Sequence, residues 1–152
     1  MDIIWKYLDK RSAAIEALKD YEAMKFIIGN TDSEIVEERE RMVSIGSPSW
    51  DGAVSTHSTD AGQNRIINGI EEIDILKERY RQAMEYMAWF EPAWNQLSED
   101  EHYVLDSFYC SNVYGKNAAL KVADYFKIEQ ASAYRKKNRA LDRLTVLLFG
   151  KF

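Results

Sequence analysis

The side chains best suited to chemistry are hydrogen-bond donors gathered near the carboxyl end of the chain. Apolar residues are interspersed among them at helical spacing. Ala133 and Ala140 are seven residues apart, and Leu141 and Leu144 continue the same stripe. One helix face would therefore pack inward, and the other faces would present donors that suit phosphate oxygens and base edges. These donors are Gln130, Ser132, Arg135, Lys137, Asn138, Arg139 and Arg143.

A short apolar helix precedes this basic helix, within the stretch LKVADYFKIEQASAYRKKNRALDRL at 120–144. Val122 and Ala123 would face inward, and the small Ala123 would let two backbones approach closely. Phe126 and Ile128 would close the turn between the helices. This is the layout of a helix-turn-helix, whose second helix enters the major groove of DNA.

The donors of the two helices fall into two expected roles. Arg135 is the best candidate for reading sequence, because arginine binds guanine through two hydrogen bonds, whereas Lys121 and Lys136 are expected to anchor phosphates as point charges. Tyr134 would either stack on a sugar or methyl group or wedge the helices apart. The alternative is a solvated basic helix without a ligand. The remaining predicted DNA contacts are Gln130, Ser132, Lys137, Asn138 and Arg139, with Lys137 expected to anchor phosphate as well.

Residues 97–144, which begin LSEDEHYVLDSFY, resemble the DNA-binding fourth region of bacterial sigma factors. The shared features are a short helix, a helix-turn-helix and a closing AL-x-x-L run, here Ala140, Leu141 and Leu144. The stretch from Ser132 to Leu141 and the later Leu-Leu-Phe-Gly resemble phage late-transcription activators of the ArpU/RinA type. This resemblance implies a phage or prophage regulator that recruits RNA polymerase to a late promoter.

Charge is strongly segregated along the chain. Residues 116–152 hold nine Lys or Arg and three acids, a balance of +6, while the other 115 residues hold 11 bases and 22 acids, a balance of -11. A positive potential at one end can displace counterions from double-stranded DNA, although the net charge is -5. The alternative is that these bases complement the helix dipole or form a solvated face.

Composition narrows the class of protein. A chain of 152 residues that is 46% hydrophobic can form one domain, or a small domain with a helical appendage. The single cysteine, Cys110, allows no intramolecular disulfide, and no Cys/His pairs have zinc-ligand spacing, so we expect no metal or cofactor and a reducing, cytoplasmic location. No apolar run approaches the roughly 20 residues needed to cross a membrane.

The first 95 residues predict a long helical stem. We expect helices over about 2–28 and 32–44, separated by a stop at Gly29-Asn30, and a polar loop over about 44–63 that contains Trp50. A helix from about 64 to the low nineties follows, and it is too long to be covered by the DNA-binding domain alone. Its partner would be the first helix, antiparallel, or the same helix of a second subunit. Its apolar stripe is Ile66, Ile73, Leu76, Tyr80, Ala83, Met87, Phe90 and Trp94, widened by Ile70 and Met84.

The predicted fold is therefore all-α, with a long helical hairpin, resembling a coiled coil, over 1–95 and a three-helix helix-turn-helix domain over 96–152. Ser98 and Glu101 would open that domain with a capping box. Catalysis is not expected, because His102 and Cys110 are eight residues apart, His57 lies in the polar loop, and no phosphate-binding glycine loop occurs. The expected partners are double-stranded DNA, RNA polymerase and a second copy of the chain, without a membrane. The rival function is a phage assembly or packaging protein that uses the stem and captures DNA without regulating transcription.

Overall fold

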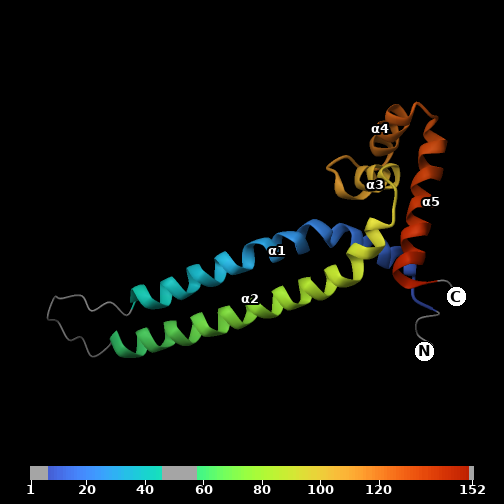
Figure 1. The fold of residues 1–152 in the computed structure, drawn as a ribbon. Helices are drawn as coiled ribbons and strands as arrows, with labels where there is room; N and C mark the ends of the chain where they lie inside the picture. The colour runs from blue at the N-terminus through green and yellow to red at the C-terminus, as the bar shows by residue number, and fades with distance from the viewer. Residues whose placement is uncertain (1–6, 46–57, 151–152) are drawn as a thin grey trace. The chain divides into compact units, whose positions relative to one another are not determined.

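The computed structural model describes residues 7–45 and 58–150, and most of these residues are helical. Figure 1 shows the helices in chain order, and no strand occurs among these residues, so the all-α class is confirmed. None of the described helices combines the length and apolar character that crossing a membrane requires. The elements are α1 (Lys10–Ile45), α2 (Ser58–Asn95), α3 (Glu99–Leu105), the π-helix η2 (Asp106–Cys110), α4 (Lys116–Phe126) and α5 (Gln130–Phe149).

The predicted stop at Gly29-Asn30 is wrong, because α1 runs through it to Ile45. A glycine ends a helix when the chain turns left-handed there, and Gly29 does not. The polar residues that follow bond back to the preceding turn: Asn30 Nδ2 donates to the carbonyl of Phe26 at 2.8 Å, and Thr31 Oγ1 donates to that of Ile27 at 2.5 Å. Polar side chains that favour turns in sequence are thus accommodated inside a helix here.

The predicted bounds of the polar loop, 44–63, are wrong at both ends, since α1 extends to Ile45 and α2 begins at Ser58. Trp50 and His57 lie outside the described residues, as do the first residues of the predicted helix at 2–28. At its described start, α1 is capped by Asp9, whose carboxylate accepts the backbone N–H of Ser12 at 3.1 Å and its hydroxyl at 2.7 Å. These bonds lower the pKa of Asp9.

The chain divides into two compact units. Residues 23–85 form what we call the middle unit, and residues 1–22 together with 86–152 form the terminal unit. The division predicted from the sequence falls instead between 95 and 96, and it stays a prediction.

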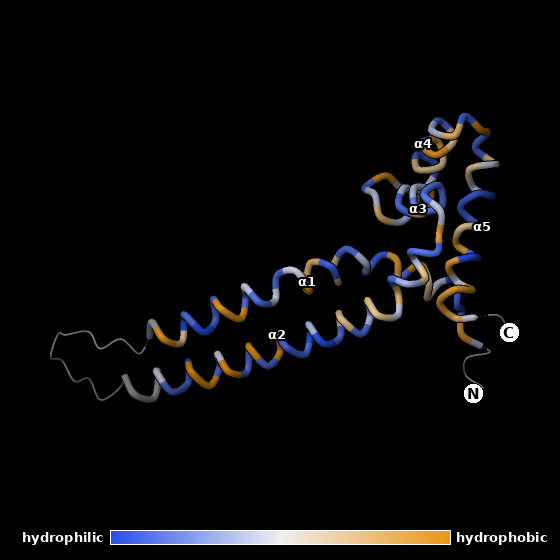
Figure 2. Tube along the Cα trace, in the orientation of Figure 1, coloured by the Kyte–Doolittle hydropathy of each residue, from blue (hydrophilic) through white to orange (hydrophobic). Residues whose placement is uncertain are grey.

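The middle unit is an antiparallel pair made of the later part of α1 and the earlier part of α2 (Figure 1). Gly69 lies against Met42, so closely that a Cβ at Gly69 would be 2.6 Å from the Met42 Cγ and Sδ atoms. Ile73 and Leu76 are buried, as the predicted stripe requires, but Ile66 and Ile70 are 44% and 50% exposed. Two helices share only one seam, and this seam is narrower than the stripe in the sequence. Figure 2 shows apolar positions recurring along both helices.

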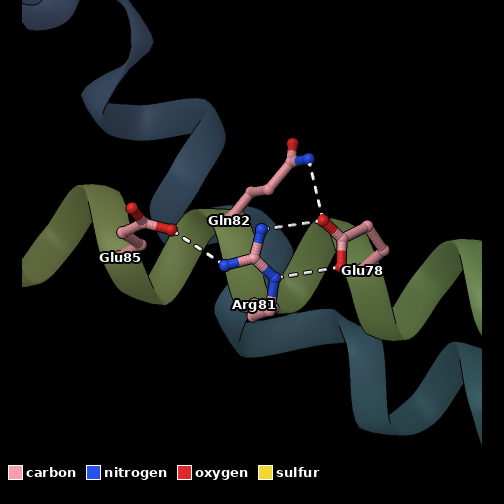
Figure 3. Close-up of polar contacts among 4 residues, drawn as sticks. All are labelled: Glu78, Arg81, Gln82 and Glu85. Atoms are coloured by element: carbon pink, nitrogen blue, oxygen red, sulfur yellow. Dashed lines mark hydrogen bonds and ion pairs between the residues drawn. The ribbon is translucent and has the colours of Figure 1, made fainter.

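Exposed charges of the middle unit are linked within single helices. On α2, Arg81 donates to Glu78 at 2.8 Å and to Glu85 at 2.9 Å, while Gln82 donates to Glu78 at 3.1 Å (Figure 3). The hydrogen bond from Arg81, followed by that from Gln82, lowers the pKa of Glu78 to about 2. Such pairs lie one turn apart and support the helix rather than the tertiary structure.

The terminal unit has an aromatic core around Phe90, which is fully buried. Its ring lies 5.1 Å from that of Tyr21 and 5.2 Å from that of Tyr86, and the Tyr86 hydroxyl donates to the carbonyl of Ala17. Contact with Trp94 extends this cluster. The start of α1 is therefore held against the end of α2 within this unit.

Candidate nucleic-acid interface

A core of small side chains positions α4 against α5. Ala118, Ala119 and Val122 of α4 have no exposed surface, and neither has Ala133 of α5. They pack with Val104 of α3 and with η2. Because alanine adds little bulk, the helix backbones can approach closely, and the predicted inner face of Val122 and Ala123 is confirmed.

The turn between α4 and α5 has a defined backbone geometry. Lys127 is left-handed, with φ 54° and ψ 50°, and it is the one described residue other than glycine with positive φ. The Ile128 N–H donates to the Ala123 carbonyl at 2.9 Å, and the Lys127 N–H to that of Asp124 at 3.4 Å. This bond pair is the Schellman arrangement that ends helices. Phe126 and Ile128 pack against the core, as predicted, and thereby set the direction of α5.

The predicted inner stripe of α5 is also confirmed: Ala133, Ala140, Leu141 and Leu144 are at most 2% exposed. The opposite side of the helix therefore faces solvent. Arg135 and Arg139 lie on that side, one turn apart, and both are exposed. Their guanidinium groups can reach a ligand without any change in the core.

Both arginines have polar neighbours. Arg135 donates to the carbonyl of Ala131 and to the hydroxyl of Ser132, both at 3.4 Å, and these long bonds leave the guanidinium near its own helix. Arg139 lines a hollow of about 240 Å³ between α3 and α5, together with Lys136, Asp100 and Glu101. The other polar candidates are half-buried on α5: Gln130, Ser132 and Asn138.

The three predicted lysine anchors lie over aromatic rings. Lys136 Nζ is 4.6 Å from the centre of the Phe126 ring, and Lys121 Nζ is 5.9 Å from that of Tyr103. Lys137 is the most withdrawn: its Nζ is 5.5 Å from the Phe108 ring, and burial, followed by repulsion from Arg11, lowers its pKa. Its ammonium group is already used in packing, whereas Lys121 is exposed.

Tyr134 takes part in helix packing. Its half-buried ring lies 5.7 Å from that of Phe108 and against the core of α4 and α5. Of the two roles expected from the sequence, this position favours the wedge. It adds volume beside the small Ala133.

Arg143 is grouped with the DNA-facing donors by its sequence position, but it has an intramolecular role. Its guanidinium donates to the Glu101 carboxylate and, at 3.0 Å, to the carbonyl of Gln96. The Glu101 carboxylate also accepts the backbone N–H of Ser98 at 3.1 Å, and the Ser98 hydroxyl accepts that of Glu101 at 3.2 Å, so the predicted capping box is confirmed. The capping-box pattern in the sequence was the available signal that Glu101 lies at a helix start.

His102 and Cys110 are structural rather than paired. The His102 ring stacks on Trp94 at 4.3 Å, and its Nε2 lies 2.6 Å from the Trp94 carbonyl oxygen. Burial, followed by the charge of Asp106, raises the pKa of the Cys110 thiol to about 12. At neutral pH this thiol is protonated and a poor nucleophile.

The class that these observations define is an all-α protein in which a small-residue core holds one basic helix outward. Comparison of the chain with protein-family models, with curated proteins and with solved structures found no match.

Proposed function

We propose that the protein is a DNA-binding transcription regulator of phage or prophage type and that α4, the turn and α5 are its helix-turn-helix. The observation that carries this proposal is the separation of the two sides of α5. Ala133, Ala140, Leu141 and Leu144 are buried on one side, and Arg135 and Arg139 are exposed on the other. A helix with this arrangement can enter a major groove while its core contacts stay intact.

The side chains suggest how the contacts would be divided. Arg135 and Arg139 would read base edges, because a guanidinium can bind guanine through two hydrogen bonds. Lys121 and Lys136, whose ammonium groups lie over the rings of Tyr103 and Phe126, would bind phosphates. The balance of +6 over residues 116–152 favours this end of the chain over the acidic remainder as the DNA-binding part.

The regulatory role comes from the resemblance rather than from the contacts. The residues by themselves support DNA binding, whereas likeness to phage late-transcription activators and to sigma region four implies promoter DNA and RNA polymerase as partners. Within this proposal the paired helices of α1 and α2 are the stem, and α3 to α5 are the DNA-binding head.

The first test is selection of bound fragments from genomic DNA with the full-length protein, followed by affinity measurements on the enriched site. We expect Arg135→Ala/Arg139→Ala to weaken binding to that site by at least about tenfold and to lose most of its preference over random DNA. The matched control is Arg65→Ala/Arg79→Ala, which removes the same charge from exposed positions on α2. Circular dichroism would verify that both variants remain helical.

The proposal is contradicted if the α5 variant binds the selected site as tightly as the wild type, or if the α2 control loses as much affinity. A promoter-reporter assay then addresses regulation. Transcription that depends on Arg135 and Arg139 supports a regulator, whereas specific binding without any change in transcription supports the assembly or packaging role.

A further inference from the structure

The middle unit exposes large apolar side chains that the pairing of α1 with α2 leaves uncovered. On α1, Val36 and Val43 are 51% and 74% exposed, and on α2, Ile70 and Met84 are 50% and 45% exposed. Residues seven apart on a helix lie within about 20° of one another, so Val36 and Val43 share a stripe. Lys77 stands seven residues from both Ile70 and Met84 and places them on one stripe of α2.

A groove of about 420 Å³ joins these two stripes, because Val36 of the first and Lys77 of the second both line it. Its apolar lining includes Ile35 and Tyr80. The two stripes therefore belong to one surface, which we call the apolar flank. It comprises Ile35, Val36, Val43, Ile66, Ile70 and Met84.

Charges of both signs border the groove, with Asp32 and Arg39 on α1 and Lys77 on α2. No ion pair joins these three side chains within the described part of the molecule. In a two-fold interface each contact occurs twice with the partners exchanged, so a surface that carries an acid and bases beside an apolar centre can complement itself. We propose that the apolar flank binds the same flank of a second copy of this chain.

The area of the apolar flank indicates how strongly two copies should associate. The rise from Ile66 to Met84 is about 27 Å, and two adjacent helices are about 20 Å wide, which gives about 500–600 Å² for each copy. A standard interface buries about 800 Å² on each partner. The dimer should therefore be weak, with a dissociation constant in the range of about 1–100 μM.

Sedimentation equilibrium of the full-length protein without DNA tests the proposal. We expect a reversible monomer-dimer equilibrium, and we expect Val36→Lys and Ile70→Lys each to raise the dissociation constant at least about tenfold, because each copy would have to bury an unpaired ammonium group in an apolar contact. The matched control is Ile75→Lys. Ile75 is 53% exposed and Ile70 is 50% exposed, so the two positions are similarly accessible. Ile75 lies about 140° away from Ile70 around α2, so Ile75→Lys should leave the equilibrium unchanged.

The proposal is overturned if the wild type stays monomeric up to about 1 mM, if dimers persist in both flank variants, or if Ile75→Lys dissociates them equally. Circular dichroism on each variant separates loss of association from loss of helix. Because no DNA is present, failure here leaves the proposed DNA binding untouched, and failure of DNA binding leaves this surface untouched.

Discussion

The terminal and middle units bury their apolar residues to very different extents. The terminal unit encloses whole aromatic side chains, with Phe90 at 0% and Trp94 at 8% exposure, whereas the middle unit leaves Phe26 62% exposed and Ile67 53% exposed. Several helix segments meet in the terminal unit and can surround a ring, but a pair of helices covers a side chain from one direction only. The terminal unit is therefore expected to supply most of the stability, and the middle unit keeps a larger share of its large apolar side chains exposed.

Polar contacts differ in the same way. In the terminal unit, Arg143 bonds to Glu101 and Tyr86 to Ala17, so side chains join segments that are far apart in sequence. In the middle unit, the charged contacts of Arg81 remain within α2 (Figure 3). Contacts between distant segments specify the tertiary structure, whereas contacts within one helix support helix formation only.

The largest difference between the two units is expected when a phenylalanine ring is removed from each. Phe90→Ala should lower the free energy of unfolding by about 3–5 kcal/mol, because it leaves a cavity among Tyr21, Tyr86 and Trp94. The same change at exposed Phe26 should cost less than about 0.5 kcal/mol. Urea unfolding of both variants measures this contrast, and equal losses would contradict it.

A smaller effect is expected when arginine contacts are removed. Arg143→Gln should lower the free energy of unfolding by about 1 kcal/mol, since the contacts with Glu101 and Gln96 hold α5 in place but are partly exposed. Arg81→Gln should have a clearly smaller effect, because its partners lie on its own helix. Thermal and urea unfolding would sharpen the comparison, and a greater loss for Arg81→Gln would reverse it.

Two glycines within the middle unit should respond differently to alanine. Gly29 is exposed, with no heavy atom within 4 Å of an added Cβ, so Gly29→Ala should stabilise the helix by about 0.5–1 kcal/mol. Gly69→Ala should lose this gain, because the new Cβ would be 2.6 Å from Met42 atoms. Urea unfolding in a Met42→Ala background provides the check, and the gain should reappear there. If Gly69→Ala is as stabilising as Gly29→Ala in the wild-type background, the seam is looser than described.

The smallest effect concerns protonation of Glu78. Its pKa is lowered from 4.5 to about 2 in the folded chain, so its stabilising contribution is present above pH 4.5 and is lost as the pH falls through about 2. NMR titration of the Glu78 carboxyl carbon should give a midpoint near 2, and Arg81→Gln should move that midpoint towards 4.5. A wild-type midpoint of 4.5 would show that the contacts in Figure 3 do not persist in solution.

Local patterns in the sequence were sufficient for much of the candidate site. Helical spacing predicted the buried stripe of α5, and the capping-box pattern predicted the start of α3. The turn was located by Phe126 and Ile128, but its left-handed residue is Lys127 rather than glycine, which no local rule indicated. The continuity of α1 through Gly29-Asn30 was missed, because side chains that favour a turn also bond to the carbonyl one turn earlier.

By itself, the sequence determined that the chain is helical, that α5 has one buried face, and that positive charge gathers in residues 116–152. These properties depend on residues within one or two helical turns of each other, so they are visible in the spacing of residue types along the sequence. Only the tertiary structure decided that Arg143 donates a hydrogen bond to Glu101, that Lys137 lies over Phe108, and that Ile70 remains exposed. Each of these depends on which helix passes nearby, and the helical period within one segment carries no information about its neighbours in space.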